Sequence, residues 1–274
     1  MKRSDFRSII RLTNEERWGF GIRDLKRMMA LQPRGCLVAV VDKHAVGFTT
    51  AISYGRELGW IGNVVVHREH RRAGIGSNLV RTAVRYLLRS HVKRIGLFSF
   101  LENRSMYERL DFGTTGGFVR LSTSRRAGGK ATQNGGVPFR QILRLDKRAF
   151  GADRARLLKR LLREFPKNWT WTRRGAKLSG YSVVKQYQDS SEIGPSVSKE
   201  MDYDATATLL QYSAGLARKW PLELSVPESN RTVLETAGEL GFRVVRKGLV
   251  MSHAGSDPVT VSPAIIAFGF LDKG

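Results

Sequence analysis

The sequence has a single cysteine, Cys36, among its 274 residues. One cysteine can form neither an internal disulfide nor a zinc site built from cysteines. Its position in the apolar run CLVAVV indicates a buried strand residue, and no partner histidine is evident nearby in sequence. We therefore expect neither disulfides nor thiol catalysis.

Long apolar runs are also missing. No run approaches the roughly 18 residues that a membrane-spanning helix needs, and the charged stretch MKRSDFRSIIRLTNEERWGF lacks the apolar segment of a signal peptide. The 41% hydrophobic and 9% aromatic content is typical of a globular protein. These features predict a cytoplasmic protein, and the length favours two domains at about 150 residues each.

Acidic side chains are scarce. The chain has 24 Asp or Glu against 47 Lys or Arg, a formal net charge of +23. Such a charge attracts phosphates, nucleic acid or acidic proteins. The excess is spread over both halves, and no block of like charges forms a separate arm. Two interpretations stay open: a surface for an anionic partner, or the solvated surface of a basic protein.

The first half alternates helix and strand signals. Residues 24–31 have a helical pattern, CLVAVV and AVGFTTAISY form an apparent hairpin around a DKH turn, and WIGNVVV is a further strand. From Ile75 to Leu88 apolar residues recur at helical spacing. IGLFSF then predicts a strand and MYERL a helix.

The second half repeats landmarks of the first. Gly47 and Phe48 correspond to Gly180 and Tyr181 at an offset of 133 residues; Ile61 and Gly62 correspond to Ile193 and Gly194 at 132; Leu110 and Phe112 correspond to Leu240 and Phe242 at 130. Such near-constant offsets indicate a domain duplication. The stretch SRRAGGKATQNGGV, rich in Gly, Ser and Asn, predicts the linker.

One segment has the pattern of a phosphate-binding turn. The strand WIGNVVV leads through HREHRRAGIGS into the amphipathic helix. Helix N-termini offer unpaired N–H groups and a positive dipole end, which together can bind a pyrophosphate. Gly74 and Gly76 permit close backbone approach, while Arg71 and Arg72 add charge. The alternative is a simple strand-to-helix turn.

Two other phosphate loops do not fit. GIGSNL lacks the third glycine of the dinucleotide-binding fingerprint, and Ile95 and Gly96 stand where that motif needs an acidic residue. The chain has no GxxxxGK[ST] sequence, so it lacks the simple P-loop motif.

The segment VVVHREHRRAGIGSNLV resembles motif A of the GNAT superfamily of N-acetyltransferases, whose core is [QR]xxGx[GA]. Arg71, Gly74 and Gly76 match that core. MYERLDF resembles the family's LYEKLGF segment, with Tyr107 at the tyrosine position and Asp111 in place of the usual glycine. Together the two motifs cover about residues 20–120.

The second half is similar to the GNAT-like C-terminal domain of YitH-like acetyltransferases over nearly all of residues 142–253. It departs from that pattern at Ser225, where an aspartate is expected. Its turn, IGPSVSKEMDYD, has no RxxGxG and carries acidic residues, which would repel a pyrophosphate. We therefore expect one cofactor site per chain.

The resemblance implies an α/β fold of α+β type, with tandem GNAT-like domains that each have a mixed, mostly antiparallel sheet flanked by helices. We expect a catalytic domain at 1–125, a linker at 126–141 and a degenerate domain at 142–274 that contributes to the acceptor site. The implied cosubstrate is acetyl-coenzyme A. Its predicted binding residues are Val64, Val65, Val66, Arg71, Arg72, Ala73, Gly74, Ile75, Gly76, Ser77 and Asn103.

By the same resemblance, the backbone of Val64–Val66 pairs with the pantetheine arm, and an N–H near Val65 stabilises the oxyanion. Tyr107 is the expected general acid, although it is also compatible with a packed aromatic. Asn103 is predicted to bind cofactor or substrate, and capping of the MYERL helix explains it equally well.

The general base has no clear candidate. An amine such as that of lysine has a pKa near 10.4 and must lose a proton before attack. WIGNVVV has no carboxylate, so Glu57 is the nearest candidate, although an exposed hairpin residue is an equal alternative. Glu69 can simply balance arginines, and a water relay remains open. His67, His70 and His91 lack an HExxH pattern, so no metal site is predicted.

The leading functional hypothesis is an N-acetyltransferase acting on a primary amine of a small molecule or protein. The alternatives are a nucleic-acid-associated binding protein with a vestigial or regulatory acyl-CoA site, and an enzyme using another acyl-CoA. No motif identifies the acceptor or the oligomeric state.

Overall fold

The computed structural model describes residues 1–125, 136–199 and 203–269. Their contacts divide the chain into two compact units. The first comprises described residues 1–115 and 250–259, and the second comprises 116–125, 136–199, 203–249 and 260–269. Most of the predicted linker lies outside the described residues. No described helix is long and apolar enough to cross a membrane.

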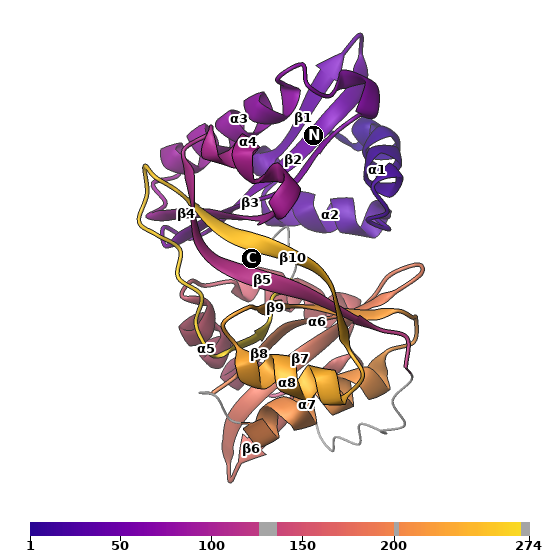
Figure 1. The fold of residues 1–274 in the computed structure, drawn as a ribbon, viewed down its shortest axis with the longest axis vertical. Coiled ribbons are helices and arrows are strands. Elements are labelled where there is room, and N and C mark those ends of the chain that lie inside the picture. The colour runs from indigo at the N-terminus through magenta and orange to yellow at the C-terminus, as the bar shows by residue number, and fades with distance from the viewer. Residues whose placement is uncertain (126–135, 200–202, 270–274) are drawn as a thin grey trace. The chain divides into compact units, whose positions relative to one another are not determined.

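The first unit follows the predicted alternation of helices and strands (Figure 1). Its elements are η1 Arg3–Asp5, α1 Phe6–Glu15, α2 Ile22–Leu31, η2 Pro33–Gly35, β1 Cys36–Val41, β2 His44–Tyr54, β3 Leu58–Val66, η3 Arg68–His70, α3 Ile75–Arg89, β4 Arg94–Phe100, η4 Leu101–Asn103, α4 Arg104–Glu108 and the start of β5 Phe112–Thr123. Its strand order is β1-β2-β3-β4-β10-β5.

In its described residues the second unit repeats the order of α-helices and strands, without the short 3-10 helices and with β11 added. Its elements are α5 Phe139–Phe150, α6 Ala155–Glu164, β6 Trp169–Arg174, β7 Lys177–Gln186, β8 Ser191–Ser198, α7 Tyr203–Leu216, β9 Leu222–Pro227, α8 Arg231–Glu239, β10 Arg243–His253 and β11 Ile265–Ala267. Its strand order is β10-β5-β9-β8-β7-β6, with β11 on β8. Strand β3 pairs with β4, and β8 with β9, in parallel. Antiparallel pairing joins β1 with β2, β2 with β3, β5 with β9, β6 with β7, β7 with β8, and β8 with β11. The expected mixed, mostly antiparallel sheet and the duplication are confirmed.

The repeated glycine–aromatic pair has a packing role in each unit. A Cβ on Gly47 would lie 3.0 Å from the Leu79 side chain of α3, and a Cβ on Gly180 would lie 2.7 Å from Leu209 of α7. Neighbouring strand residues face opposite sides of a sheet, so Phe48 and Tyr181 turn the other way. Both aromatic side chains are fully buried. The glycine therefore lets a helix approach one face, and the aromatic side chain fills the other.

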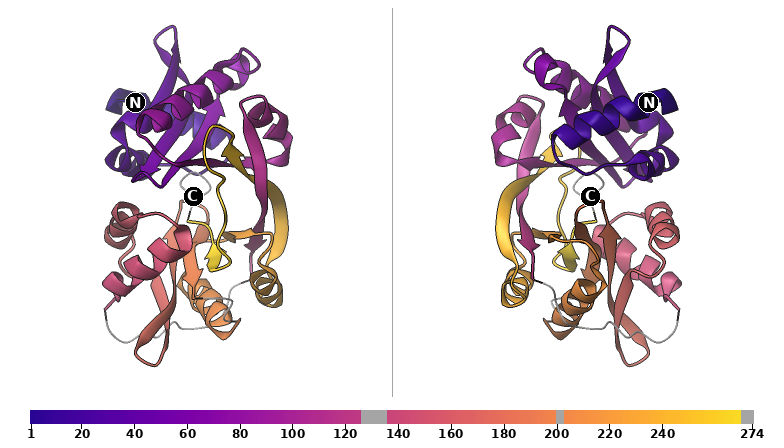
Figure 2. Two further views of the ribbon diagram at one scale, coloured as in Figure 1. Left: turned by 90° about the vertical axis from the view of Figure 1, so that its left-hand side faces the viewer. Right: turned by 90° about the vertical axis from the view of Figure 1, so that its right-hand side faces the viewer.

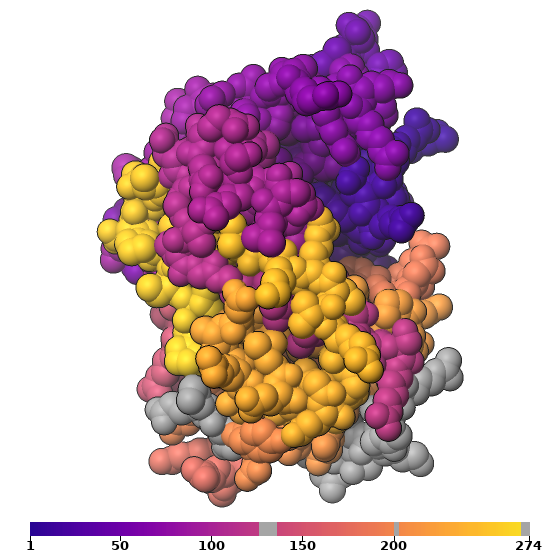
Figure 3. All heavy atoms as spheres, in the orientation of Figure 1, coloured from indigo at the N-terminus to yellow at the C-terminus, as the bar shows by residue number. Residues whose placement is uncertain are grey.

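Helix α1 is an element that the sequence reasoning did not predict. Its buried residues Phe6, Ile9, Leu12 and Thr13 lie three or four positions apart, which is the spacing of one helical face. The three apolar residues among them, Phe6, Ile9 and Leu12, join Leu25 and Met28 of α2 in a core against the sheet. Figure 2 shows α1 as an indigo ribbon from two sides, and Figure 3 shows the indigo atoms of this part of the chain at the surface.

The boundary between the units differs from the predicted domain bounds. Residues 116–123 of β5 belong to the second unit, where Phe118–Thr123 pair with β9. Residues 250–259 belong to the first unit. There the Ser256 hydroxyl accepts from the Ile95 N–H at 3.0 Å, and the Ala254 N–H donates to the Asp111 carbonyl at 2.7 Å. The first unit is therefore completed by residues from far along the chain.

Candidate active site

Strands β3 and β4 separate at one end of the first unit's sheet. Their parallel pairing extends from Leu58 with Arg94 to Ile61 with Leu97. Beyond it β3 continues to Val66, paired on its other side with β2, while β4 ends at Phe100. The backbone of Val64–Val66 on the β4 side is thus not paired with β4. This opening is a slot in which an extended ligand can add to the sheet by main-chain hydrogen bonds.

A bulge in β3 marks the start of the slot. The pairing register of β2 and β3 shifts between Phe48 and Thr50, and Asn63 has a positive φ of 55°. The Asn63 side-chain amide donates to the Thr50 hydroxyl at 2.9 Å, and the Thr50 and Thr49 hydroxyls donate to the Gly62 carbonyl at 3.2 and 2.8 Å. These buried contacts stabilise a change of strand direction beside the slot.

The hydrogen bonding of β2 identifies which backbone groups face the slot. The His67 N–H donates to the Val46 carbonyl at 2.8 Å. Because such groups alternate along an antiparallel strand, the N–H and C=O of Val65 turn toward β2, and those of Val64 and Val66 turn toward the slot. The Arg71 Nε, which donates to the Val66 carbonyl at 3.0 Å, agrees with this direction.

The glycine turn after β3 has the geometry of a helix N-terminal anion site. Gly74 is the N-cap of α3 and is left-handed, with φ at 78°. The Asn78 N–H makes the first helical bond, to the Gly74 carbonyl at 3.0 Å. The amides of Ile75, Gly76 and Ser77 precede it and have no partner within the helix. Successive free amides at the positive end of a helix can bind a phosphate.

The two glycines of the turn are needed for different reasons. Gly74 adopts a φ that L side chains rarely take, although a Cβ there would meet no atom within 4 Å. At Gly76 a Cβ would make only ordinary contacts, 3.6 Å from Val66 and 3.9 Å from Met106. Packing of the protein therefore does not require glycine at Gly76, which leaves space at the amides for a ligand. The predicted cradle fits a pyrophosphate.

Arg71 and Arg72 have different surroundings. The Arg71 guanidinium forms an ion pair with Glu16, which follows α1, and bonds the Val66 carbonyl. Its charge is thus already partly neutralised within the protein. Arg72 is exposed and has a positive φ of 64°. Sequence reasoning missed the contact with Glu16, because the two residues lie far apart in the chain.

Tyr107 lies on α4 and is 6% exposed. Its ring packs edge-to-face on Phe112, with ring centroids 6.1 Å apart. Burial raises the pKa of the Tyr107 phenol far above its usual value of 10.0. The phenol therefore keeps its proton at neutral pH and is a weaker acid than an exposed tyrosine.

Asn103 occupies the N-cap position of α4, but its side chain makes no capping hydrogen bond. It is exposed, as is the neighbouring Glu102. The capping explanation of Asn103 is thus not realised in this structure, and its amide is available for a ligand.

Glu57 does not lie near the slot. It is in the turn between β2 and β3, at the end of β3 opposite Val66, which is about 26 Å away along a strand that rises about 3.3 Å per residue. Its carboxylate pairs with the Lys93 ammonium at 3.0 Å, and both side chains are at least half exposed. Glu57 is therefore a hairpin surface residue, and we withdraw it as a candidate base.

The histidines and Glu69 do not gather into a metal site. In the described residues, no three His, Cys, Asp or Glu side chains form a group that could hold a metal ion. The His67 and His70 rings lie 5.8 Å apart, and Glu69 Oε2 lies 3.9 Å from His67 Nδ1. His91 lies just beyond the end of α3. None of these residues is thereby assigned as a general base.

The matching slot of the second unit is filled by the chain itself. Strands β8 and β9 pair only from Ser191 with Leu222 to Ile193 with Leu224. Beyond that point β11 pairs with β8, with Ile265 opposite Val197 and Ala267 opposite Ser196. The Phe268 N–H then donates to the Ser225 carbonyl of β9 at 2.9 Å. Residues 265–268 thus occupy the gap between β8 and β9. The corresponding gap between β3 and β4 in the first unit stays open.

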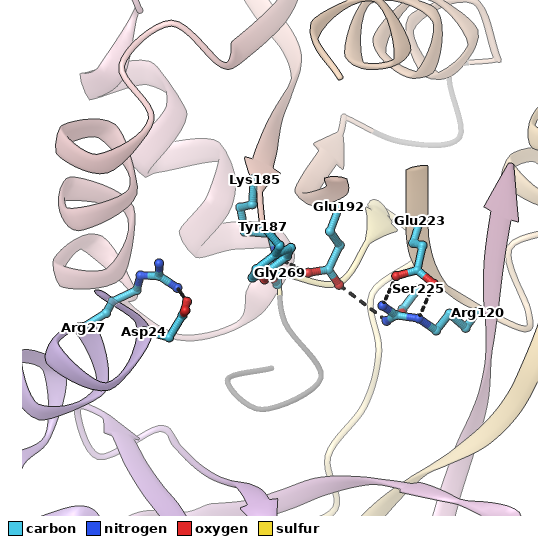
Figure 4. A network of polar contacts seen from close by, with 9 residues as sticks. All are labelled: Asp24, Arg27, Arg120, Lys185, Tyr187, Glu192, Glu223, Ser225 and Gly269. Carbon is cyan, nitrogen blue, oxygen red and sulfur yellow. Dashed lines mark hydrogen bonds and ion pairs between the residues drawn. The ribbon is translucent and has the colours of Figure 1, made fainter. Parts of the chain in front are cut away.

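The second unit also carries a buried ionic network (Figure 4). The Lys185 ammonium contacts Glu192 at 2.7 Å, and Arg120 lies 3.6 Å from Glu192 and 2.6 Å from Glu223. Arg120 also donates to the Ser225 hydroxyl at 3.3 Å. Ser225, where the resemblance leads one to expect an aspartate, thus contributes a hydroxyl to a network whose carboxylates are Glu192 and Glu223.

Comparisons with known proteins agree with this architecture. A model described as "Acetyltransferase (GNAT) family" matches residues 4–112, and one described as "Acetyltransferase (GNAT) domain" matches residues 142–265. Over 241 residues the chain is 23% identical to YitH of Bacillus subtilis strain 168, named an uncharacterized N-acetyltransferase, covering 85% of this chain and 83% of YitH.

Two solved structures share the fold over nearly the whole chain. A Pyrococcus horikoshii protein assigned to the acetyltransferases superposes with a TM-score of 0.82 at 21% identity, covering 100% of this chain and 94% of that one. A tandem GNAT protein from the clavulanic acid biosynthesis pathway, solved without AcCoA, superposes with a TM-score of 0.64 at 13% identity, covering 93% and 95%. The tandem arrangement is thus shared with a solved GNAT protein.

Proposed function

Because the chain belongs to the GNAT superfamily of acetyltransferases, we propose that its first unit transfers an acetyl group from acetyl-coenzyme A to a primary amine. The amine belongs to a small molecule or a protein. The observation that carries the proposal is the open slot between β3 and β4, which leads directly to the glycine turn at the start of α3.

The binding roles follow from the directions of the backbone groups. Within the segment Arg71–Ser77, the amides of Ile75, Gly76 and Ser77 hold the pyrophosphate, and Arg72 adds charge. Val64 and Val66 pair with the pantetheine arm, because their backbone groups turn toward the slot, and Asn103 contributes its free amide. The predicted oxyanion donor near Val65 is more specifically the N–H of Val64 or Val66, since that of Val65 turns toward β2.

The chemical step forms a bond between the amine nitrogen and the acetyl carbon and breaks the bond between that carbon and sulfur. The ammonium form of the amine loses one proton before attack and a second one afterwards, and the leaving thiolate gains one, so one proton is released to solvent for each acetyl group transferred. By resemblance to the family, Tyr107 supplies the proton to sulfur; its buried phenol is protonated at neutral pH, and its raised pKa means that the leaving thiolate must draw the proton from a weakly acidic group. Removal of the amine proton is assigned to a water relay, since Glu57 lies at the far end of β3.

We further propose one acetyl-coenzyme A site per chain. The second unit has no RxxGxG turn, and β11 fills its slot. Both features oppose binding: the first removes the pyrophosphate cradle, and the second removes the free strand edge. Two predictions from the sequence are kept. The second unit is expected to contribute to the acceptor site, and the protein is expected to be cytoplasmic.

The direct experiment measures thiol release from acetyl-coenzyme A with a panel of small amines and lysine-containing peptides. We expect amine-dependent release with at least one acceptor class. Isothermal titration calorimetry of the cofactor should give one site per chain. Release that is equally fast with propionyl-coenzyme A would extend the donor to other acyl groups, and cofactor binding without release for any amine would contradict acetyl transfer.

A further inference from the structure

The second unit has a local excess of positive charge that the acetyl-transfer site does not use. Residues 139–177, from α5 to the start of β7, contain thirteen Lys or Arg and three Asp or Glu. The corresponding stretch of the first unit, residues 6–44, has the same length and contains eight and four. The excess therefore arose in one copy of the duplicated fold and is not a property of the fold.

Helical spacing gathers this charge on the outer faces of α5 and α6. The exposed side chains of α5 recur at intervals of three or four residues, as do the basic residues of α6. These residues are Arg140, Arg144, Lys147 and Arg148 on α5, and Arg156, Lys159, Arg160 and Arg163 on α6. Such spacing places each set on one face of its helix.

The opposite faces of the two helices are apolar and buried. Ile142 and Ala149 of α5, and Leu157, Leu158 and Leu161 of α6, are at most 7% exposed. The connection 151–154 is short, and both views in Figure 2 show the two helices side by side. We call the outer surface formed by these eight basic residues the α5–α6 basic face.

Few carboxylates neutralise the α5–α6 basic face. Asp146 is 1% exposed and accepts hydrogen bonds of 2.8, 2.9 and 3.1 Å from Arg154, so it does not reach the surface. Glu164 pairs with Arg160 at 3.0 Å, and Asp153 lies 4.0 Å from Lys147. Arg140, Arg144, Arg148 and Lys159 are exposed, and exposed positive charges create an attractive potential for anions.

We infer that the α5–α6 basic face binds the phosphate backbone of double-stranded nucleic acid. Two rows of cations on adjacent helices match a ligand with closely spaced negative charges along a rigid axis. Residues 139–177 are all described, and none of their large apolar side chains is exposed. The face therefore lacks the apolar anchors of a membrane-binding helix and the exposed rings that stack on single-stranded bases.

The test compares two charge-reversal variants of equal net charge. One is Arg144→Glu/Arg148→Glu/Lys159→Glu on the α5–α6 basic face. The matched control is Arg81→Glu/Arg85→Glu/Arg89→Glu on α3, where these three arginines are also exposed and lie on one helical face. Binding of labelled 20-base-pair DNA and RNA duplexes is followed by fluorescence anisotropy between 50 and 200 mM salt, and thermal unfolding verifies that both variants fold.

We expect salt-dependent binding of the unmodified chain, weakened at least about 30-fold by the α5–α6 variant and less than about 3-fold by the control. The slope of log affinity against log salt should fall by about 2.7 in the α5–α6 variant, since each lost phosphate contact contributes about 0.9. Tighter binding of one duplex identifies the natural form.

Three results would overturn the inference. Equal weakening in both variants would show that net charge alone drives binding. Absence of duplex binding at 50 mM salt would show that double-stranded nucleic acid is not the partner of this face. Equal or tighter binding to vesicles of three parts phosphatidylcholine and one part phosphatidylserine, or to polyglutamate, would assign the face to a membrane or to an acidic protein.

Discussion

The two units have the same order of helices and strands, yet the matching slots in their sheets differ. In the first unit the slot between β3 and β4 is open and leads to a glycine turn. In the second unit β11 fills the gap between β8 and β9. The position that corresponds to Tyr107 by the repeat is Ala237, which is fully buried. The second copy therefore lacks both a tyrosine at this position and the free strand edge.

A second difference lies in the sheet itself. Ile52 pairs with Trp60, which pairs with Gly96, and at the same register of the second unit Lys185 pairs with Glu192, which pairs with Glu223. A Cβ on Gly96 would lie 2.8 Å from the Trp60 ring. At this register of the sheet, the side chains of the first unit pack around the Trp60 ring, and those of the second unit form ion pairs. The backbone of the fold accommodates both.

The largest expected effect comes from separating the two halves. A fragment of residues 1–125 lacks residues 250–259 and so leaves β4 and the start of β5 without their neighbouring strand. We expect no cooperative thermal unfolding of this fragment, followed by circular dichroism. A cooperative transition near that of the whole chain would show that the first unit is complete without those residues.

The ionic network of the second unit can be weakened by Glu192→Gln. Removing one charge of a buried pair should cost about 3–5 kcal/mol in the free energy of unfolding, measured by urea denaturation at pH 7. The control is Trp60→Phe at the matching register, where we expect a cost of about 1–2 kcal/mol without any charge effect. Equal losses in the free energy of unfolding for the two variants would show that ion pairing at this position contributes no more stability than packing does.

The same residue predicts a pH dependence. Burial disfavours the charged Glu192, but Lys185 and Arg120 outweigh it and hold its pKa below the usual 4.5. A lowered pKa contributes stability that is present above about pH 4.5 and is lost as the pH falls through the folded value. Stability of the unmodified chain should therefore fall below pH 4.5, with a smaller fall in Glu192→Gln.

The proposed acid role of Tyr107 is a chemical difference between the two units, because Ala237 stands at the matching position of the second unit. Tyr107→Phe should lower the turnover number by about 10²-fold or more, because the thiolate then leaves without a positioned acid. Affinity for acetyl-coenzyme A, measured by calorimetry, should stay unchanged. Unchanged turnover would refute the acid role and leave Tyr107 as a packed aromatic.

The glycine turn should decide cofactor affinity. Gly76→Val would place methyl groups where the phosphate approaches the amides, so we expect at least about tenfold weaker binding of acetyl-coenzyme A by calorimetry. Gly238→Val in α8 of the second unit, where a Cβ meets no atom within 4 Å, is the matched control. Equal affinity in all three proteins would place the pyrophosphate elsewhere.

The smallest effect is expected at Glu57. Because its carboxylate pairs with Lys93 at the far end of β3, Glu57→Gln should change turnover by less than about twofold. A pH–rate profile that loses its acidic limb in this variant would return Glu57 to the list of candidate bases.

Much of the fold could be predicted from local patterns. The predicted strands at CLVAVV, AVGFTTAISY and WIGNVVV, and the helix from Ile75, are present with bounds shifted by a few residues. Helix α1 was missed although Phe6, Ile9 and Leu12 have helical spacing. The general base could not be predicted, because it depends on groups that meet only in three dimensions.

The sequence by itself determined the duplication and the anion-binding turn, since offsets, helical spacing and glycine positions are local properties of the chain. Only the tertiary structure decided which slot stays open. The pairing of Ile265 with Val197 and the contact of Ile95 with Ser256 join residues far apart in sequence. Such contacts depend on which backbone hydrogen bonds remain unsatisfied after the sheets have formed, and no local pattern encodes them.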